Sequence, residues 1–325
     1  MSKYLKLFEN HSQYEAFIGG GGMDRPNVSY CKDNNEVHYN PSGWKYEYLT
    51  FEVVEGGTIT IKATDASVAK TISYKVNDGE WTELTTSTTE QAFGGTLNVG
   101  DKVLVRGNNA TYGTLRYYNN FSGTAKVNVY GNIMSLISGD DFADSITLSE
   151  GFTFMRLFNG YTNLLSAEKL VLPATTLADN CYQNMFQGTS IITAPELPAT
   201  TLASGCYGGM FYNCTSLTSA PELPATTLAT YCYQNMFKGC TSLTKAPELP
   251  ATTLAIACYQ NMFQGCTSLN YIKAMFTTTP STSYTNYWVY NVASTGTFVK
   301  NSAATWDVTG NDGIPTGCTV ETATA

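Results

Sequence analysis

Two rows of residues in the second half of the chain have side chains that could bind a ligand. Three glutamates, Glu196, Glu222 and Glu248, and four tyrosines recur at almost constant spacing; the tyrosines are Tyr182, Tyr207, Tyr233 and Tyr259. If the rows stack about 4.8 Å apart, the carboxylates would either repel and stay solvated or form an anionic stripe for a cation or a basic partner. The phenol rings would either pack together or form an aromatic stripe for a sugar or a protein. These seven residues are the candidate binding residues.

The rows arise from a segment that is repeated between residues 172 and 269. Each copy begins with LPATTLA, and the prolines of this motif are separated by 25, 26 and 26 residues; they are Pro173, Pro198, Pro224 and Pro250. Such a period indicates repeats that stack, because one repeat cannot bury its own apolar face. The Leu, Met and Phe residues that all copies share should lie inside the stack. Positions that differ between copies, such as Tyr231 and Lys245, should face solvent.

Seven of the nine cysteines belong to the same repeats. They form two rows, Cys181, Cys206, Cys232 and Cys258, and Cys214, Cys240 and Cys266. The separation within a repeat does not match a zinc or redox motif, and the chain has only two histidines. We expect buried, reduced thiols, with disulfide pairing and metal binding as the alternatives. The block C-Y-x-x-M-F predicts a short helical turn whose Cys and Met side points inward.

The blocks CYGGMFYNCTSLT and CYQNMFKGCTSLT resemble the BspA-like leucine-rich-repeat family of Bacteroides surface proteins and phages. This resemblance implies one short strand, a turn and a helical or irregular segment per repeat, stacked into a curved solenoid. The implied strand is TSLTSAPELP and its equivalents. It departs from the family because it contains Pro195, Pro221 or Pro247, and proline cannot donate to a strand ladder.

The fold expected for the whole chain is mainly β with short helices, arranged as four parts. Residues 1–45 are predicted to be an attachment segment with a helix over 12–18 and a hairpin. Residues 46–134 contain seven short runs of strand character between Gly- and Asn-rich turns, which predict an Ig-like or jelly-roll-like β-sandwich. Residues 135–275 are the solenoid, and residues 276–325 are a C-terminal cap in which Trp288 and Trp306 cover the last repeat.

Composition and motifs argue against several functions. A net charge of −8 argues against nucleic acid as a partner, and the chain has no apolar run long enough to span a membrane. Ser67 and Lys70 match a Ser-x-x-Lys hydrolase motif, but no partner motif accompanies them. We therefore expect no enzyme activity, no catalytic residues, no cofactor and no metal site.

The function expected from these observations is that of a phage virion structural protein, a fibre or decoration subunit made in the host cytoplasm. The N-terminal sequence lacks the pattern of a secretion signal. The stretch PNVSYCKDNNEVHYNP resembles N-terminal segments of Bacteroides-phage structural proteins. The N-terminal region would bind other virion proteins and the solenoid a host surface glycan or protein, in a possible homo-oligomer that would be a trimer in a fibre. The alternative is a BspA-like adhesin or glycan-binding protein on the Bacteroides cell surface.

Overall fold

The computed structural model describes residues 5–8, 28–31, 36–39 and 43–323. Strands dominate, and the helices are single turns: α2 (Ser135–Ser138), η1 (Gly43–Tyr46), η2 (Ala66–Val68) and η3 (Phe142–Asp144). The prediction of a mainly β chain with short helices is confirmed. The helix predicted over 12–18 lies outside the described residues. Among the described residues, no helix is long and apolar enough to cross a membrane.

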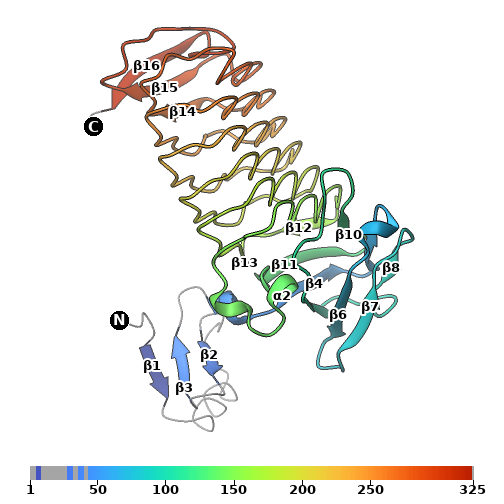
Figure 1. The fold of residues 1–325 in the computed structure, drawn as a ribbon. Coiled ribbons are helices and arrows are strands. Elements are labelled where there is room, and N and C mark those ends of the chain that lie inside the picture. The colour runs from blue at the N-terminus through green and yellow to red at the C-terminus, as the bar shows by residue number, and fades with distance from the viewer. Residues whose placement is uncertain (1–4, 9–27, 32–35, 40–42, 324–325) are drawn as a thin grey trace.

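A small antiparallel sheet contains the N-terminal strands β1 (Leu5–Phe8), β2 (Val28–Cys31) and β3 (Glu36–Tyr39). Its order is β1-β3-β2, and β2 pairs with β3 antiparallel, as expected of the predicted hairpin. Figure 1 shows this sheet beside the main body and close to the start of the repeat region.

Two further sheets occupy the region up to residue 171. The larger has the order β12-β11-β4-β9-β6-β7, with β13 also paired to β11, and the smaller has the order β10-β5-β8. The strands are β4 (Leu49–Glu55), β5 (Ile59–Ala63), β6 (Thr71–Val76), β7 (Thr82–Thr85), β8 (Gln91–Ala92), β9 (Lys102–Gly107), β10 (Asn119–Gly123), β11 (Lys126–Asn132), β12 (Leu164–Ser166) and β13 (Leu170–Val171). Phe51 of β4 contacts Phe121 of β10 with 4.9 Å between ring centroids, so the sheets share one aromatic core.

Six of the seven runs predicted as strands in this region form strands, and the seventh does not. The run GTLNV contributes only an isolated bridge between Leu97 and Gly57. Strand β10 was not predicted, because NNFSG combines Asn and Gly, which rarely favour strands. It forms because Phe121 lies in the core and the strand pairs along its whole length with β5.

From residue 147 onward, successive repeats lie one above the other as stacked coils, where a coil is one turn of the chain around the stack (Figure 1). Backbone N–H groups reach the coil above: Tyr182 donates to Cys206, and Tyr207 donates to Cys232, both at 3.0 Å. The same bonds continue through Phe263 to Trp288, into the segment predicted as the cap. The last coils add a parallel sheet of β14 (Tyr271–Ala274), β15 (Gly296–Asn301) and β16 (Cys318–Ala323).

The predicted helical turn at C-Y-x-x-M-F is wrong, because the segment is a series of tight turns. Alternate N–H groups bond within the coil and to the next coil: Met185 donates to Tyr182, whereas Phe186 donates to Met210. The backbone has positive φ at every fourth residue, for example Asn184 and Asn235. Gly209 occupies the same position with φ +61°, and a Cβ there would lie 2.1 Å from Asn184 Oδ1. Asn and Gly therefore recur there because both tolerate the left-handed region.

Candidate binding groove

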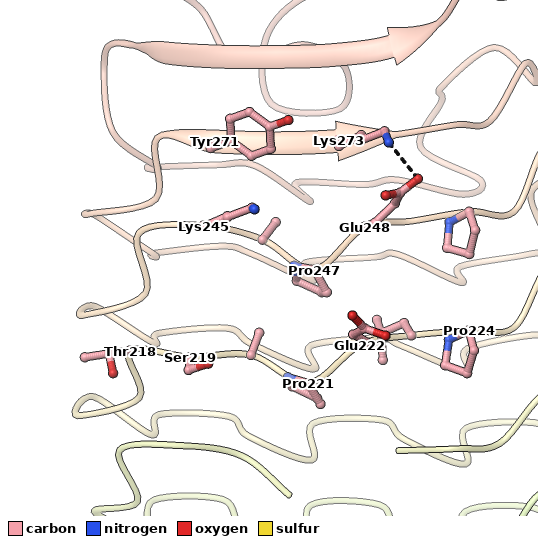
Figure 2. A pocket seen from close by; sticks show the side chains of 14 residues that line it. Thr218, Ser219, Pro221, Glu222, Pro224, Lys245, Pro247, Glu248, Tyr271 and Lys273 are labelled. Atoms are coloured by element: carbon pink, nitrogen blue, oxygen red, sulfur yellow. Dashed lines mark ion pairs between the residues drawn. The ribbon is translucent and has the colours of Figure 1, made fainter. Parts of the chain in front are cut away.

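An open groove of about 730 Å³ lies across three neighbouring coils near the C-terminal end of the stack (Figure 2). It is lined by residues 218–224, residues 245–248, Pro250, Tyr271 and Lys273. We call it the inter-coil groove. It runs over the segments that the resemblance implied to be strands.

The prolines explain why these coils separate here. No backbone hydrogen bond joins residues 218–224 to residues 245–250, all of which the structure describes. Pro221 and Pro247 have no N–H to donate, so a ladder cannot form across them. One coil further on, Ile272 replaces the proline, and Tyr271–Ala274 forms the regular strand β14. The expected strand is therefore reduced to isolated bridges, such as Thr193 to Ser219, in the proline-containing copies.

Charged side chains of both signs face the inter-coil groove. Lys273 and Glu248 form an ion pair at 2.9 Å, which the dashed line in Figure 2 marks. Glu222, directly below in the same row, has no ion pair or side-chain hydrogen bond within the described part of the chain. The Lys245 ammonium lies 5.3 Å from the centroid of the Tyr271 ring, and none of the ion pairs between described residues includes it. The groove thus presents one carboxylate and one ammonium group that are not neutralised by a neighbour.

The predicted glutamate row is divided by the structure. Glu196, Glu222 and Glu248 are all exposed, as solvated carboxylates should be. Glu222 and Glu248 line the groove, whereas Glu196 lies outside it. In the next coil, Lys273 lies next to Glu248 and forms an ion pair with it. A fourth glutamate at this place would instead repel Glu248.

The predicted tyrosine stripe is corrected by the structure, because its rings are interior. Tyr182, Tyr207, Tyr233 and Tyr259 are each 1% exposed or less. Their rings stack face to face with centroids 5.7, 6.0 and 6.0 Å apart. Turns bring both sides of the C-Y-x-x-M-F block into the core, so these tyrosines cannot contact a ligand at the surface.

Both cysteine rows are also interior, and all seven thiols are free. Cys240 and Cys266 donate to the carbonyls of Phe211 and Phe237, each one coil earlier, at 3.0 and 2.9 Å. Burial raises the pKa of Cys206 and of Cys258 to about 12. These thiols act as small apolar residues that also bridge coils. Within the described residues, no group of His, Cys, Asp and Glu could hold a metal ion.

Sequence reasoning missed Lys273 and Tyr271 as lining residues. Both lie beyond the last clear repeat, where YIKAMF replaces the APELP motif. A repeat of 26 residues places Tyr271 at the position of Lys245, and the bridge between those two residues keeps this spacing. Lys273 reaches Glu248 only because the spacing shortens to 25 residues by the bridge from Leu249 to Ala274, a change that the sequence does not indicate.

A second, polar cavity of about 460 Å³ lies beside β6 and β9, and its charges are mostly paired. Arg106 forms an ion pair with Asp140, which also accepts a hydrogen bond from Tyr48 at 2.9 Å. The Arg106 guanidinium lies 4.1 Å from the centre of the Trp81 ring. Because Arg106 is held by both neighbours, this cavity is a weaker binding candidate than the groove.

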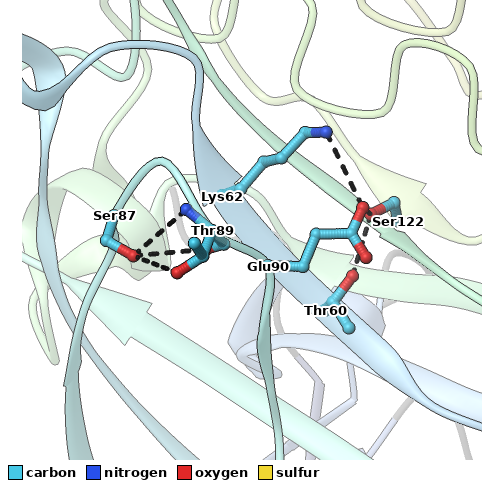
Figure 3. Close-up of polar contacts among 6 residues, drawn as sticks. All are labelled: Thr60, Lys62, Ser87, Thr89, Glu90 and Ser122. Atoms are coloured by element: carbon cyan, nitrogen blue, oxygen red, sulfur yellow. Dashed lines mark hydrogen bonds and ion pairs between the residues drawn. The ribbon is translucent and has the colours of Figure 1, made fainter.

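The hydroxyl groups of the β-sheet region are held in structural networks. The Ser67 hydroxyl donates to Asp65 at 2.6 Å, and the Asp65 carboxylate caps helix η2 by also accepting from the Ser67 amide at 2.9 Å. Figure 3 shows a second network, in which Ser122 donates to Glu90 at 3.3 Å and Lys62 lies 3.7 Å from the same carboxylate. Thr60 shares a 2.8 Å hydrogen bond with Ser122, so this network ties the segment before β8 to β5 and β10.

The inter-coil groove therefore combines an extended shape with charges of both signs on one face of the stack. Comparison of the chain with family models, with curated proteins and with solved structures gave no match.

Proposed function

We propose that this chain is a non-enzymatic binding protein of a phage particle, a fibre or decoration subunit that presents the stacked coils to a host surface. The observation that carries the proposal is the inter-coil groove, an open site across neighbouring coils in which Glu222 and Lys245 form no ion pair with any described residue. Such a site suits an extended polymer, because contacts in neighbouring coils add at high effective concentration.

The finer classification of the fold is part of this proposal. Leu217, Leu243 and Leu269, which follow the Thr-Ser pair of each repeat, are all buried in the stack. This burial supports a BspA-like leucine-rich-repeat solenoid, as do the hydrogen bonds between coils. The aromatic contact between the two sheets of the preceding region supports a β-sandwich.

The positions of the N-terminal sheet and of the groove suggest that they bind different partners. The N-terminal sheet lies beside the start of the stack, and the groove lies toward the other end (Figures 1 and 2). We assign attachment to other virion proteins to the N-terminal region and host contact to the coils. This arrangement holds the binding face away from the particle.

Two measurements test the proposal. Antibodies against the purified chain should label phage particles in electron micrographs, and the fluorescently labelled chain should bind Bacteroides cells in flow cytometry. Labelling of the cell envelope in uninfected cultures would instead support the adhesin alternative. Failure of the chain to bind any cell, together with unlabelled particles, would contradict the proposal.

A further inference from the structure

We propose that the inter-coil groove binds an extended polypeptide segment in which a basic side chain meets Glu222 and an acidic side chain meets Lys245. This inference rests on the proposed binding function and names the chemistry of the partner. The partner is a surface protein with an exposed extended segment of mixed charge.

The charges of the groove supply the first argument. Glu248 is already neutralised by Lys273 at 2.9 Å, so it offers little to a ligand. Glu222 has no such partner among the described residues, and Lys245 only overlies the Tyr271 ring. A partner with both signs of charge satisfies both groups, whereas a partner of one sign meets repulsion at one of them.

The spacing of the two groups supplies the second argument. Lys245 occupies the same repeat position as Ser219, three residues before Glu222. Three extended residues span about 10 Å, and one coil adds about 5 Å in the perpendicular direction. Side chains on one face of an extended peptide recur about every 6.8 Å. Opposite charges two to four residues apart can therefore reach both groups, given the flexibility of the lysine side chain.

The main chain of the groove supplies the third argument. The N–H groups of Glu222 and Leu223 donate to no backbone carbonyl within the described chain. Polar main-chain groups need partners from water or a ligand. An extended peptide brings a donor and an acceptor with every residue, as in strand addition. A neutral glycan brings hydroxyl groups but neither charge, so the observations favour a peptide.

The test uses short synthetic peptides and fluorescence anisotropy with the full chain. In the probe peptide, Thr alternates with Glu and Lys; the controls contain only Thr and Glu, or only Thr and Lys. The chain should bind the mixed peptide at least about fivefold more tightly than either control. Glu222→Gln and Lys245→Gln should each weaken binding of the mixed peptide about threefold to fivefold, the range of one exposed ion pair.

Matched variants separate the groove from general charge effects. Glu196→Gln removes a carboxylate of the same row outside the groove, and Lys238→Gln removes an ammonium group that lies over Tyr212 instead. Both should bind the mixed peptide like the parent chain. Equal losses in these controls, or no loss in the groove variants, would overturn the proposal.

Two further outcomes keep this inference distinct from the proposed function. An acidic oligosaccharide that binds through Lys245 more tightly than the mixed peptide would overturn the peptide assignment and leave host binding intact. Cell binding that is unchanged in the Glu222→Gln, Lys245→Gln double variant would overturn the groove as the host-binding site. Circular dichroism of each variant confirms that the fold is retained.

Discussion

The amide of Met275 donates a 2.9 Å hydrogen bond to the carbonyl of Leu249, one coil earlier. In the preceding coil, the position of Met275 is occupied by Pro250, which has no N–H. Leu223 occupies the position of Leu249, so its carbonyl lacks the equivalent bond. Pro250 therefore removes one bond between coils, in addition to the change from Pro247 to Ile272.

Pro250→Met should close this part of the groove. The new amide can donate to the Leu223 carbonyl, as Met275 donates to Leu249. The free energy of unfolding should change little, because one hydrogen bond contributes about 1 kcal/mol and loss of a proline costs a similar amount. Hydrogen exchange measured by NMR should show a protected amide at residue 250. Exchange at the rate of a free amide would mean that proline is not the cause of the opening.

Tyr233→Phe should leave the stability unchanged or raise it by about 1 kcal/mol. The Tyr233 hydroxyl is buried and has no hydrogen-bond partner among the described residues, so its removal relieves a desolvation cost. Tyr233→Ala should instead lower the free energy of unfolding by about 3–5 kcal/mol, because it leaves a cavity between two stacked rings. Urea denaturation measures both. A large loss in Tyr233→Phe would show that the hydroxyl has a bonded partner.

The stacking of the repeats and much of the core could be predicted from sequence, and the groove could not. Residues that all copies share, such as Met236 and Phe237, are buried, because only stacking removes them from water. The turn pattern was missed because Cys-to-Met and Tyr-to-Phe spacings of four suit a helix equally well. The key to the turns was the Asn or Gly that every copy has at two positions four residues apart, such as Asn184 and Gly188, because both residue types tolerate positive φ.

The tyrosine row shows the limit of reasoning from repetition. An invariant Tyr in each copy is compatible with both a buried stack and an exposed stripe, because phenol is apolar with a polar end. The exposed stripe is not formed, because the tight turns direct the side chains of both Cys206 and Tyr207 into the core. Lys273 was missed because it is not repeated at all: it lies in a coil whose sequence no longer matches the repeat.

The thiol of Cys240 should stabilise the stack through its hydrogen bond to the Phe211 carbonyl, which measures 3.0 Å. Thr189 takes the place of this cysteine in the first full copy, and its hydroxyl donates at 2.9 Å to the carbonyl of Phe186, three residues earlier in the same coil. Cys240→Thr should therefore be more stable than Cys240→Val by about 1 kcal/mol, since the two differ only in a donor. Thermal unfolding compares the pair. Equal melting temperatures would show that the thiol only fills space.

Alkaline pH should destabilise the stack before the tyrosines ionise. Burial raises the pKa of Cys206, Cys258 and Cys266 from 9.0 to about 12, so these thiols stay protonated in the folded chain while the unfolded chain loses their protons. The contribution of these thiols to the free energy of unfolding is complete below pH 9 and is lost as the pH rises toward 12. Each thiol should lower the free energy of unfolding by about 1.4 kcal/mol per pH unit in this range.

Urea denaturation at a series of pH values checks this dependence. Cys258→Ala should be less stable than the parent chain at neutral pH. Above pH 9, its free energy of unfolding should fall less steeply with pH than that of the parent chain, because one thiol no longer contributes. A free energy of unfolding that stays constant between pH 9 and 10 would contradict burial of the thiols.

The most direct test of the account compares two charge reversals in one row of glutamates. Glu222→Lys lies in the inter-coil groove and Glu196→Lys lies outside it, although both side chains are exposed and both changes alter the net charge equally. Binding of the labelled chain to Bacteroides cells should fall about tenfold for Glu222→Lys and stay at the parental level for Glu196→Lys, because only the first replaces the carboxylate of the groove with a second ammonium group. Equal binding by the two variants would contradict the claim that the groove is the binding site.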